Sequence, residues 1–139
     1  MLIIVCIDEK NGMMFNHRRQ SRDSAVCQDI LKECRGKKLY MSSYSQKLFG
    51  EAQEAEIQIS DNILNQARES DACFIEDIRL SDFEDRIQTV ILYKWNRKYP
   101  ADLYFTLDLS DGSWEFQRTE EFNGSSHERI TKEVYERTR

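Results

Sequence analysis

The chain has 139 residues and a net charge of −5, with 20 Lys and Arg residues against 25 Asp and Glu residues. This length predicts one domain, residues 1–139, built around a single core. The acidic balance argues against a general nucleic-acid binder, because phosphate contacts need clustered basic residues. The apolar start, residues 2–7, is too short to cross a membrane and has no basic leader, so we expect a cytoplasmic protein without a membrane partner.

The first half of the chain alternates strand and helix patterns. Residues 2–7 are apolar on both faces, which predicts a strand at the centre of an α/β sheet. Ligands of such sheets bind at the carboxyl ends of the strands, so we expect a site between Ile7 and Asn16. A helix with an apolar stripe over residues 27–34 follows, with Ser21 or Asp23 as its N-cap.

The remaining elements are short, and the second half is nearly all β. Strands are predicted at residues 38–42, 56–60, 72–75, 89–93, 102–107 and 114–122, and helices at 43–49, 61–70 and 78–86. Asn123-Gly124 is a hairpin signal, and the closing segment 128–137 alternates like a strand, although its charge also permits a helix. This order predicts an α/β fold with a mixed, mostly parallel sheet, flanking helices and a C-terminal antiparallel hairpin.

Two groups of polar residues are candidates for ligand binding. The first follows the opening strand and could meet a small anionic ligand at the start of the next helix; it comprises Asn16, His17, Arg18 and Arg19. A solvated basic loop explains the same residues. The second, Ser43 and Ser45, begins a helix and could bind a phosphate, although helix capping accounts for it as well.

Other chemistry finds little support in the sequence. Serine residues have no His–Asp partner nearby in sequence, so a hydrolytic triad is not predicted. The four cysteines lie in apolar patterns without a C-x-x-C pair and are expected to be buried free thiols. Aromatic residues of the β half, Trp95 and Tyr99 among them, are expected to pack across strands.

An ordered set of segments resembles the dihydrofolate reductase family. The segment IIVCIDEKNGMMFN resembles the opening strand of that family and the loop that follows it. The segment GKKLYMSSYSQKLF resembles a second strand of the family and the helix after it. The segment FEDRIQTVILYKW looks similar to the end of a helix and the start of the longest strand in that family. The segments GSWEFQRTEEF and ITKEVYER look similar to its last hairpin and closing strand. The resemblance covers most of the chain and passes over a shortened middle, residues 50–72. It implies the dihydrofolate-reductase-like fold.

The same resemblance argues against the family's cofactor. Where that family has paired glycines for the NADPH pyrophosphate, this chain has Glu76-Asp77, which would repel the pyrophosphate and obstruct its approach. NADPH is therefore disfavoured, and no other cofactor is indicated. The family's Arg and Thr that grip the 2′-phosphate fall on Ser43 and Ser45, and its folate-binding arginine falls in the acidic stretch around Glu54.

The family's buried catalytic carboxylate should lie at the start of the first helix, where Asp23 is the nearest candidate and Asp29 the second. We therefore expect a binding or interaction module that is not a reductase. The alternatives are a reductase of this type with an altered cofactor site, and a homodimer formed through a sheet edge that the shortened middle exposes. Short bacterial proteins named ribonuclease Z also look similar, which implies a zinc phosphodiesterase as a lesser alternative. That chemistry needs a dense histidine cluster, and only His17 and His127 are present, so no metal site is predicted.

Overall fold

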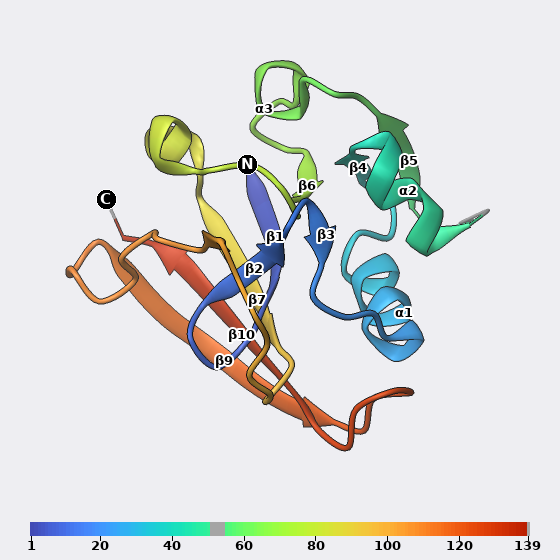
Figure 1. The fold of residues 1–139 in the computed structure, drawn as a ribbon. Coiled ribbons are helices and arrows are strands. Elements are labelled where there is room, and N and C mark those ends of the chain that lie inside the picture. Colours follow the sequence, from blue (N-terminus) through green and yellow to red (C-terminus); the bar gives the residue numbers. More distant parts are fainter. Residues whose placement is uncertain (51–54, 139) are drawn as a thin grey trace.

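A seven-stranded sheet forms the centre of the molecule, with strand order β5-β4-β6-β1-β7-β10-β9 (Figure 1). The computed structural model describes residues 1–50 and 55–138. The sheet strands are β1 (Leu2–Ile7), β4 (Lys38–Met41), β5 (Glu56–Ile59), β6 (Ala72–Phe74), β7 (Thr89–Lys94), β9 (Trp114–Phe122) and β10 (Ile130–Arg137). The pairs among β5, β4, β6, β1 and β7 are parallel, whereas β10 runs antiparallel to both β7 and β9. The predicted fold class, a mostly parallel mixed sheet ending in an antiparallel hairpin, is confirmed.

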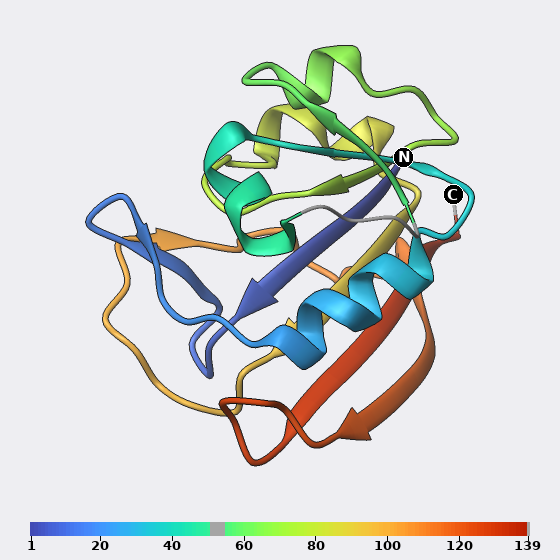
Figure 2. The ribbon, with the colours of Figure 1, turned by 90° about the vertical axis from the view of Figure 1, so that its right-hand side faces the viewer.

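The central strand β1 is buried on both faces, as its composition predicts, with Ile3, Ile4 and Val5 fully inaccessible. Alternate side chains belong to two cores. One core packs under α1 (Ser24–Glu33) and α2 (Ser43–Phe49), which lie across one face of the sheet in Figure 2. The other packs under α3 (Ile63–Gln66), the 3₁₀ helix η1 (Ser81–Arg86) and the segment from residue 103 to 114.

A buried ion cluster fixes α1 on the sheet. Lys132 of β10, only 1% exposed, donates to Asp29 over 2.7 Å and also binds Glu33, both on α1. The Tyr93 hydroxyl of β7 donates to the same Asp29 carboxylate at 2.6 Å. Because the charges of this cluster are paired and hydrogen-bonded, burying them under the helix is tolerated.

Several local elements differ from the sequence expectation. The apolar residues after the first turn form β2 (Gly12–Phe15), which pairs with β3 (Arg18–Arg19) and β8 (Leu103–Tyr104) in a separate three-stranded sheet. The predicted strand at 102–107 is thus reduced to two residues, and the helix at 61–70 to one turn. The helix at 78–86 is a 3₁₀ helix over 81–86. Residues 128–137 form a strand rather than a helix from Ile130 onward.

The predicted two-residue turn at Asn123-Gly124 is instead a longer connection, residues 123–129, between β9 and β10. Its backbone turns inward to donate hydrogen bonds to Asp23 at the start of α1, from the amides of Ser125 and Ser126. Gly124 lies so close to this contact that a Cβ there would be 2.8 Å from the carbonyl oxygen of His127. A tertiary contact has replaced the local turn.

Candidate functional site

A small pocket lies at the carboxyl ends of β1, β6 and β7, where sheets of this kind bind ligands. The β3–α1 segment, residues 20–23, passes over it, and α1 and α2 form its sides. The space inside is about 20 Å³, which is room for about one water molecule. Its lining is Cys6, Met13, Arg19, Gln20, Ser21, Arg22, Asp23, Val26, Cys27, Ile30, Leu48, Phe74, Ile75, Glu76 and Trp95. We call this space the central pocket.

Asp23 begins α1 and is the most heavily hydrogen-bonded carboxylate of the site. It caps the helix by accepting from the backbone amides of Ala25 and Val26 at 2.9 and 3.3 Å. It also accepts from the amides of Ser125 and Ser126 at 2.9 and 2.8 Å. Burial alone would raise the pKa of Asp23, but these backbone bonds and the bond from His127 hold the pKa well below its ordinary value. Asp23 is therefore a buried, permanently charged group at neutral pH.

His127 joins Asp23 to two hydroxyl groups. Its Nδ1 lies 3.0 Å from the Asp23 carboxylate, and its Nε2 lies 3.1 Å from the Ser21 hydroxyl and 3.0 Å from the Tyr99 hydroxyl. Trp95 stacks on the imidazole with ring centroids 4.7 Å apart. Because a carboxylate only accepts, the imidazole donates from Nδ1 to Asp23, and its Nε2 lies toward the two hydroxyls.

A second charged group closes the central pocket on the α2 side. The Arg19 guanidinium makes two bonds to the Glu76 carboxylate, 2.9 and 3.0 Å long, and lies 4.1 Å from the centre of the Tyr44 ring. Ser45 donates its hydroxyl to the same carboxylate at 2.7 Å. This Arg19–Glu76 latch ties the β2–β3 hairpin to the end of β6 and to α2. It occupies the place where a ligand at the end of β6 would lie.

The thiols and one amide complete the wall. Burial raises the pKa of Cys27 to about 11 and also raises the pKa of Cys6, so both thiols stay protonated and weakly nucleophilic. Gln20 donates its side-chain amide to Asp8 at 3.0 Å, while its buried Oε1 has no hydrogen-bond partner among the described residues. Such an orphaned acceptor is costly unless water or a ligand satisfies it.

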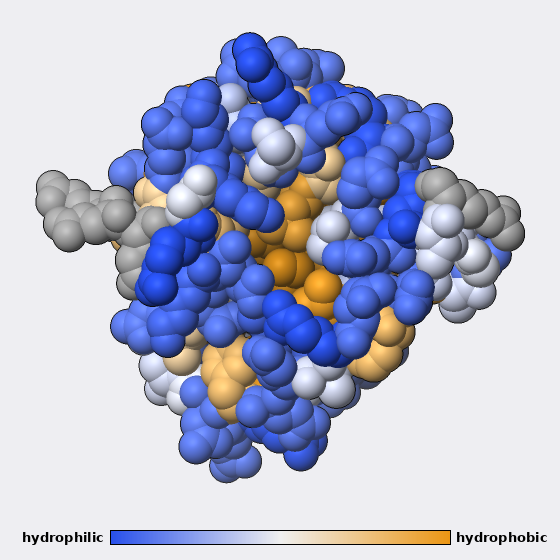
Figure 3. Space-filling view, turned by 180° about the vertical axis from the view of Figure 1, so that it is seen from behind, coloured by the Kyte–Doolittle hydropathy of each residue, from blue (hydrophilic) through white to orange (hydrophobic). Residues whose placement is uncertain are grey.

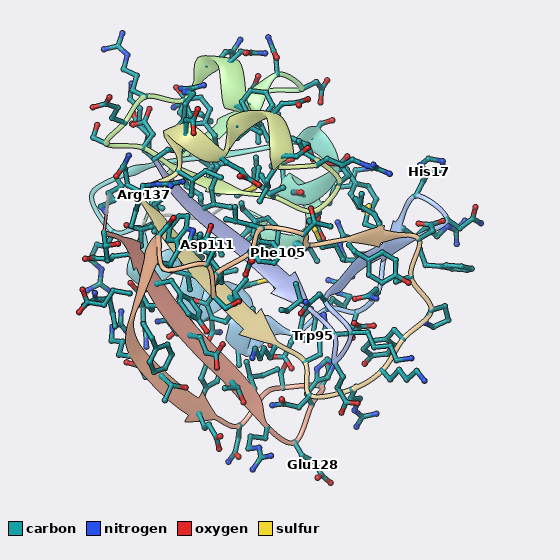
Figure 4. The ribbon with its side chains drawn as sticks, turned by 90° about the vertical axis from the view of Figure 1, so that its left-hand side faces the viewer. His17, Trp95, Phe105, Asp111, Glu128 and Arg137 are labelled. Atoms are coloured by element: carbon teal, nitrogen blue, oxygen red, sulfur yellow. The ribbon has the colours of Figure 1, made fainter. Side chains whose placement is uncertain are left out.

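The structure brings some of the predicted site residues into the pocket and places others elsewhere. Arg19 and Asp23 line it, and Ser45 reaches it through Glu76. Asn16 and His17, both with positive φ, form the exposed turn of the β2–β3 hairpin, and Figure 4 shows His17 at its tip, well away from Trp95. Both residues are exposed and lie outside the lining of the central pocket, so an anion site at this turn stays a prediction.

The other predicted residues also lie outside. Arg18 is exposed on β3 and Ser43 is exposed at the start of α2, where the capping hydroxyl is that of Ser42. Ile7 packs into the core on the opposite face of the sheet. Asp29 is held in the Lys132 cluster rather than in the pocket, so Asp23 is the carboxylate that faces it. The predicted folate-arginine position around Glu54 lies outside the described residues.

Sequence reasoning missed Ser21 as a pocket residue, as well as Trp95, Tyr99 and His127. Ser21 and His127 are 106 positions apart, and no local pattern connects them. The sequence signal for these residues was the polar run Ser125-Ser126-His127 before the closing strand. This run points to the site only when the order of the strands in the sheet is known.

A separate groove of about 420 Å³ lies at the other end of the strands. Figure 3 faces this side and shows hydrophobic side chains at the bottom of a hollow with hydrophilic residues around it. Leu2, Ile91 and Val134 are among its lining residues, with Glu33 and Arg118 at its walls. It is at the amino ends of the parallel strands, away from the convergent polar groups of the central pocket.

Two classes of site are not found in the part of the chain that the structure describes. Residues 1–50 and 55–138 contain no group of three His, Cys, Asp or Glu side chains placed to hold a metal ion, so the likeness to ribonuclease Z gains no support. The described helices also include none that is long and apolar enough to cross a membrane.

The arrangement of strands and helices can be compared with known proteins. No family model matches this chain, and no curated protein matches it. Among solved structures, the dihydrofolate reductase of Enterococcus faecalis, complexed with NADP(H) and RAB-propyl, superposes with a TM-score of 0.69 over 99% of this chain and 96% of that one. This chain has a dihydrofolate-reductase-like fold. The identity of 13% means that the likeness concerns the fold alone.

The sequence resemblance expects a carboxylate at the start of the first helix, and the central pocket lies beside that position in the structure. Asp23 has that position at the start of α1, and Glu76 lies at the end of β6, where the resemblance expects paired glycines. Asp23 agrees with the carboxylate that the resemblance expects, whereas Glu76 departs from the expected glycines.

Proposed function

We propose that the chain is a small-molecule-binding module that uses the dihydrofolate-reductase-like fold without NADPH, and that its ligand is a small organic anion. The observation that carries this proposal is the central pocket. It combines apolar walls, an orphaned Gln20 oxygen and an arginine, Arg22, that is exposed at the edge and has no hydrogen-bond or ion-pair partner within the described residues. Apolar walls with a few convergent polar groups are the usual lining of small-molecule sites.

The charge at the end of β6 supports a ligand other than NADPH. Glu76 is nearly buried, with 9% of its side chain exposed, and its bonds to Arg19 and Ser45 hold it in place. Burial and the neighbouring Glu76 charge raise the pKa of Asp77. A pyrophosphate at this edge would meet these carboxylates after breaking the Arg19–Glu76 latch, and both steps oppose its binding.

Arg22 is the cation best placed for the anionic group. It lines the central pocket and also an adjoining hollow of about 170 Å³, whose lining includes Ser125 and Ser126. The anion would lie at Arg22 while its apolar part enters between Leu48 and Val26. Because the central pocket has room for about one water, this entry requires α1 and α2 to move apart, and the ligand must be small.

Thermal unfolding with added ligands tests this proposal. NADPH and NADP should not shift the melting temperature, whereas short carboxylates such as butyrate and benzoate should raise it. A ligand at a hundred times its dissociation constant adds about 2.7 kcal/mol of stability. The variant Arg22→Gln should lose the carboxylate response, and Arg18→Gln, an exposed arginine outside the pocket, should keep it. Equal responses in both variants would contradict the assignment of Arg22.

The position of Asp23 favours a second candidate, a reductase with an altered cofactor site. A carboxylate facing the pocket from the start of the first helix is what the family resemblance requires. Its oxygens, however, already accept six hydrogen bonds, from Ala25, Val26, His127 and the backbone amides of the 123–129 connection, with the Ser125 hydroxyl as the sixth. A pterin would have no free acceptor there. NADPH oxidation in the presence of dihydrofolate, followed by absorbance, should therefore show no turnover above buffer, and micromolar NADPH binding would favour the reductase instead.

A further inference from the structure

We propose that Ser21, His127 and Asp23 form a nucleophile–base–carboxylate triad, and that the central pocket hydrolyses short-chain carboxylic esters. This activity rests on the proposed pocket for small organic anions and adds a reaction to it. The three groups stand in hydrogen-bond sequence, with the Ser21 hydroxyl 3.1 Å from Nε2 and the Asp23 carboxylate 3.0 Å from Nδ1 of the same imidazole. A triad is recognised by this geometry and not by the order of residues in the chain.

The position of the imidazole between Asp23 and Ser21 suits the role of a base. Asp23 accepts from Nδ1 of His127, so in the neutral imidazole, the form that acts as base, the proton is on Nδ1 and the Nε2 lone pair is directed toward Ser21. The carboxylate cannot turn away, because the 123–129 connection and the first turn of α1 hold both of its oxygens. Its side chain has no solvent exposure, and that of His127 is 2% exposed. The base is therefore both oriented and shielded.

Two aromatic residues position the imidazole further. Trp95 stacks on its face and limits rotation about the side chain. The Tyr99 hydroxyl is a second donor to Nε2 at 3.0 Å, so it competes with Ser21 for the same lone pair. Ser21 lines the central pocket and Tyr99 does not, which makes the serine the hydroxyl that can meet a substrate. Tyr99 is accordingly a positioning residue.

The pocket indicates the class of substrate. The pocket lining combines Ser21 with the apolar side chains of Val26, Leu48 and Phe74, which suit a short acyl chain once α1 and α2 have moved apart as the binding proposal requires. Arg22 follows Ser21 directly and is the unpaired cation of the described pocket lining, so it is available to the negative charge that develops on the carbonyl oxygen. The acid released would be a small organic anion, the same chemical class as the ligand proposed above.

The reaction balances without a cofactor. The Ser21 oxygen bonds to the ester carbonyl carbon while its proton passes to Nε2 of His127. The carbon–alkoxy bond then breaks, and the imidazolium returns this proton to the departing alkoxide, which leaves as an alcohol. Water, activated in the same way, attacks the acyl-serine and releases the carboxylic acid with Ser21 restored.

A fluorophosphonate probe and para-nitrophenyl butyrate test the assignment on the full chain. We expect the probe to label Ser21, as located by mass spectrometry of the digested protein, and butyrate ester hydrolysis to exceed the buffer rate. Ser21→Ala should abolish labelling and lower the hydrolysis rate by at least about a hundredfold. Ser24→Ala, an exposed serine three residues away, should behave like the wild type in both measurements.

Two further variants keep the proposal open to refutation if a substitution disturbs folding. His127→Ala should lose activity that added imidazole partly restores, whereas a structural role would not respond to imidazole. Tyr99→Phe leaves Nε2 to Ser21 alone, so labelling should be at least as fast as in the wild type. Absence of labelling at Ser21 in folded protein, or hydrolysis unchanged in Ser21→Ala, overturns the triad. Carboxylate-induced stabilisation of Ser21→Ala shows separately whether the binding function stands.

Discussion

Replacing Asp23 by alanine should be the most destabilising single change in the site. The substitution removes the N-cap of α1, which typically contributes about 1 kcal/mol. It also leaves the amides of Ser125 and Ser126 and the Nδ1 group of His127 without their acceptor. Unsatisfied buried donors cost about 1 to 3 kcal/mol each, but water can enter and reduce that cost. We therefore expect a total loss of about 3 to 5 kcal/mol.

Two carboxylates of the same helix allow a matched comparison. In Asp29→Ala, Lys132 retains Glu33 as a partner, and only the Tyr93 hydroxyl loses its acceptor, so the expected loss is about 1 to 2 kcal/mol. Asp23→Asn should fall between the alanine variant and the wild type. Asparagine is a good N-cap, but its NH2 group would replace one of the two oxygens that accept from the 123–129 connection, and two donors would then face each other.

Urea unfolding followed by tryptophan fluorescence measures these differences. Trp95 stacks on His127, so its emission also reports whether the 123–129 connection has come away from α1. For a chain of this length, the expected loss in Asp23→Ala corresponds to a fall in melting temperature of about 10 to 20 °C. A loss below about 1 kcal/mol, or a smaller loss than in Asp29→Ala, would refute the view that Asp23 organises both segments.

The remaining predictions concern acid sensitivity, close packing and the latch. The pKa of Asp23 is lower in the folded chain than in the unfolded chain, where such a carboxyl titrates at about 3.9. The contribution of Asp23 to the free energy of unfolding is therefore complete above about pH 5 and is lost as the pH falls further. The urea midpoint should therefore fall more between neutral and acidic pH in the wild type than in Asp23→Asn; equal falls in the two proteins would contradict this. Gly124→Ala should force the 123–129 connection away from α1 and cost about 1 to 3 kcal/mol, measured by urea unfolding, and a neutral effect would show that the loop adapts freely. Glu76→Met alone should lower the free energy of unfolding by about 3 kcal/mol, because Arg19 is then left without its ion-pair partner. Adding Arg19→Met should restore most of that loss. A double-mutant cycle that finds no coupling between the two positions would show that the Arg19–Glu76 latch does not contribute to stability.

The edge strand β5 allows one further test. It is at the end of the sheet, with Ile59 48% exposed, as the proposal of a homodimer through this edge requires. Light scattering after size exclusion should give a dimer mass that Ile59→Lys converts to a monomer mass. A monomer mass for the unmodified chain at high concentration would remove that proposal.

Local pattern determined much of the fold. The doubly apolar run of β1, the cap and stripe of α1 and the alternation of β10 can be recognised in the sequence, because burial on one or both faces has a fixed period along a strand or helix. The order of these elements was sufficient to predict the mixed sheet. The same reasoning placed the N-cap of α1 at Ser21 or Asp23, since helix caps have a local chemical signature, and the structure has Asp23 there.

The site depended on tertiary structure. The sequence placed Asn16 and His17 near a ligand, but in the structure they form the exposed turn of the β2–β3 hairpin. Conversely, Ser21 and His127 meet because β10 returns antiparallel beside β7, which carries the 123–129 connection to the start of α1. Sequence periodicity reports which face of an element is buried. It carries no information about which distant loop supplies the last hydrogen bonds, because that depends on strand order and on the exact path of the chain between strands.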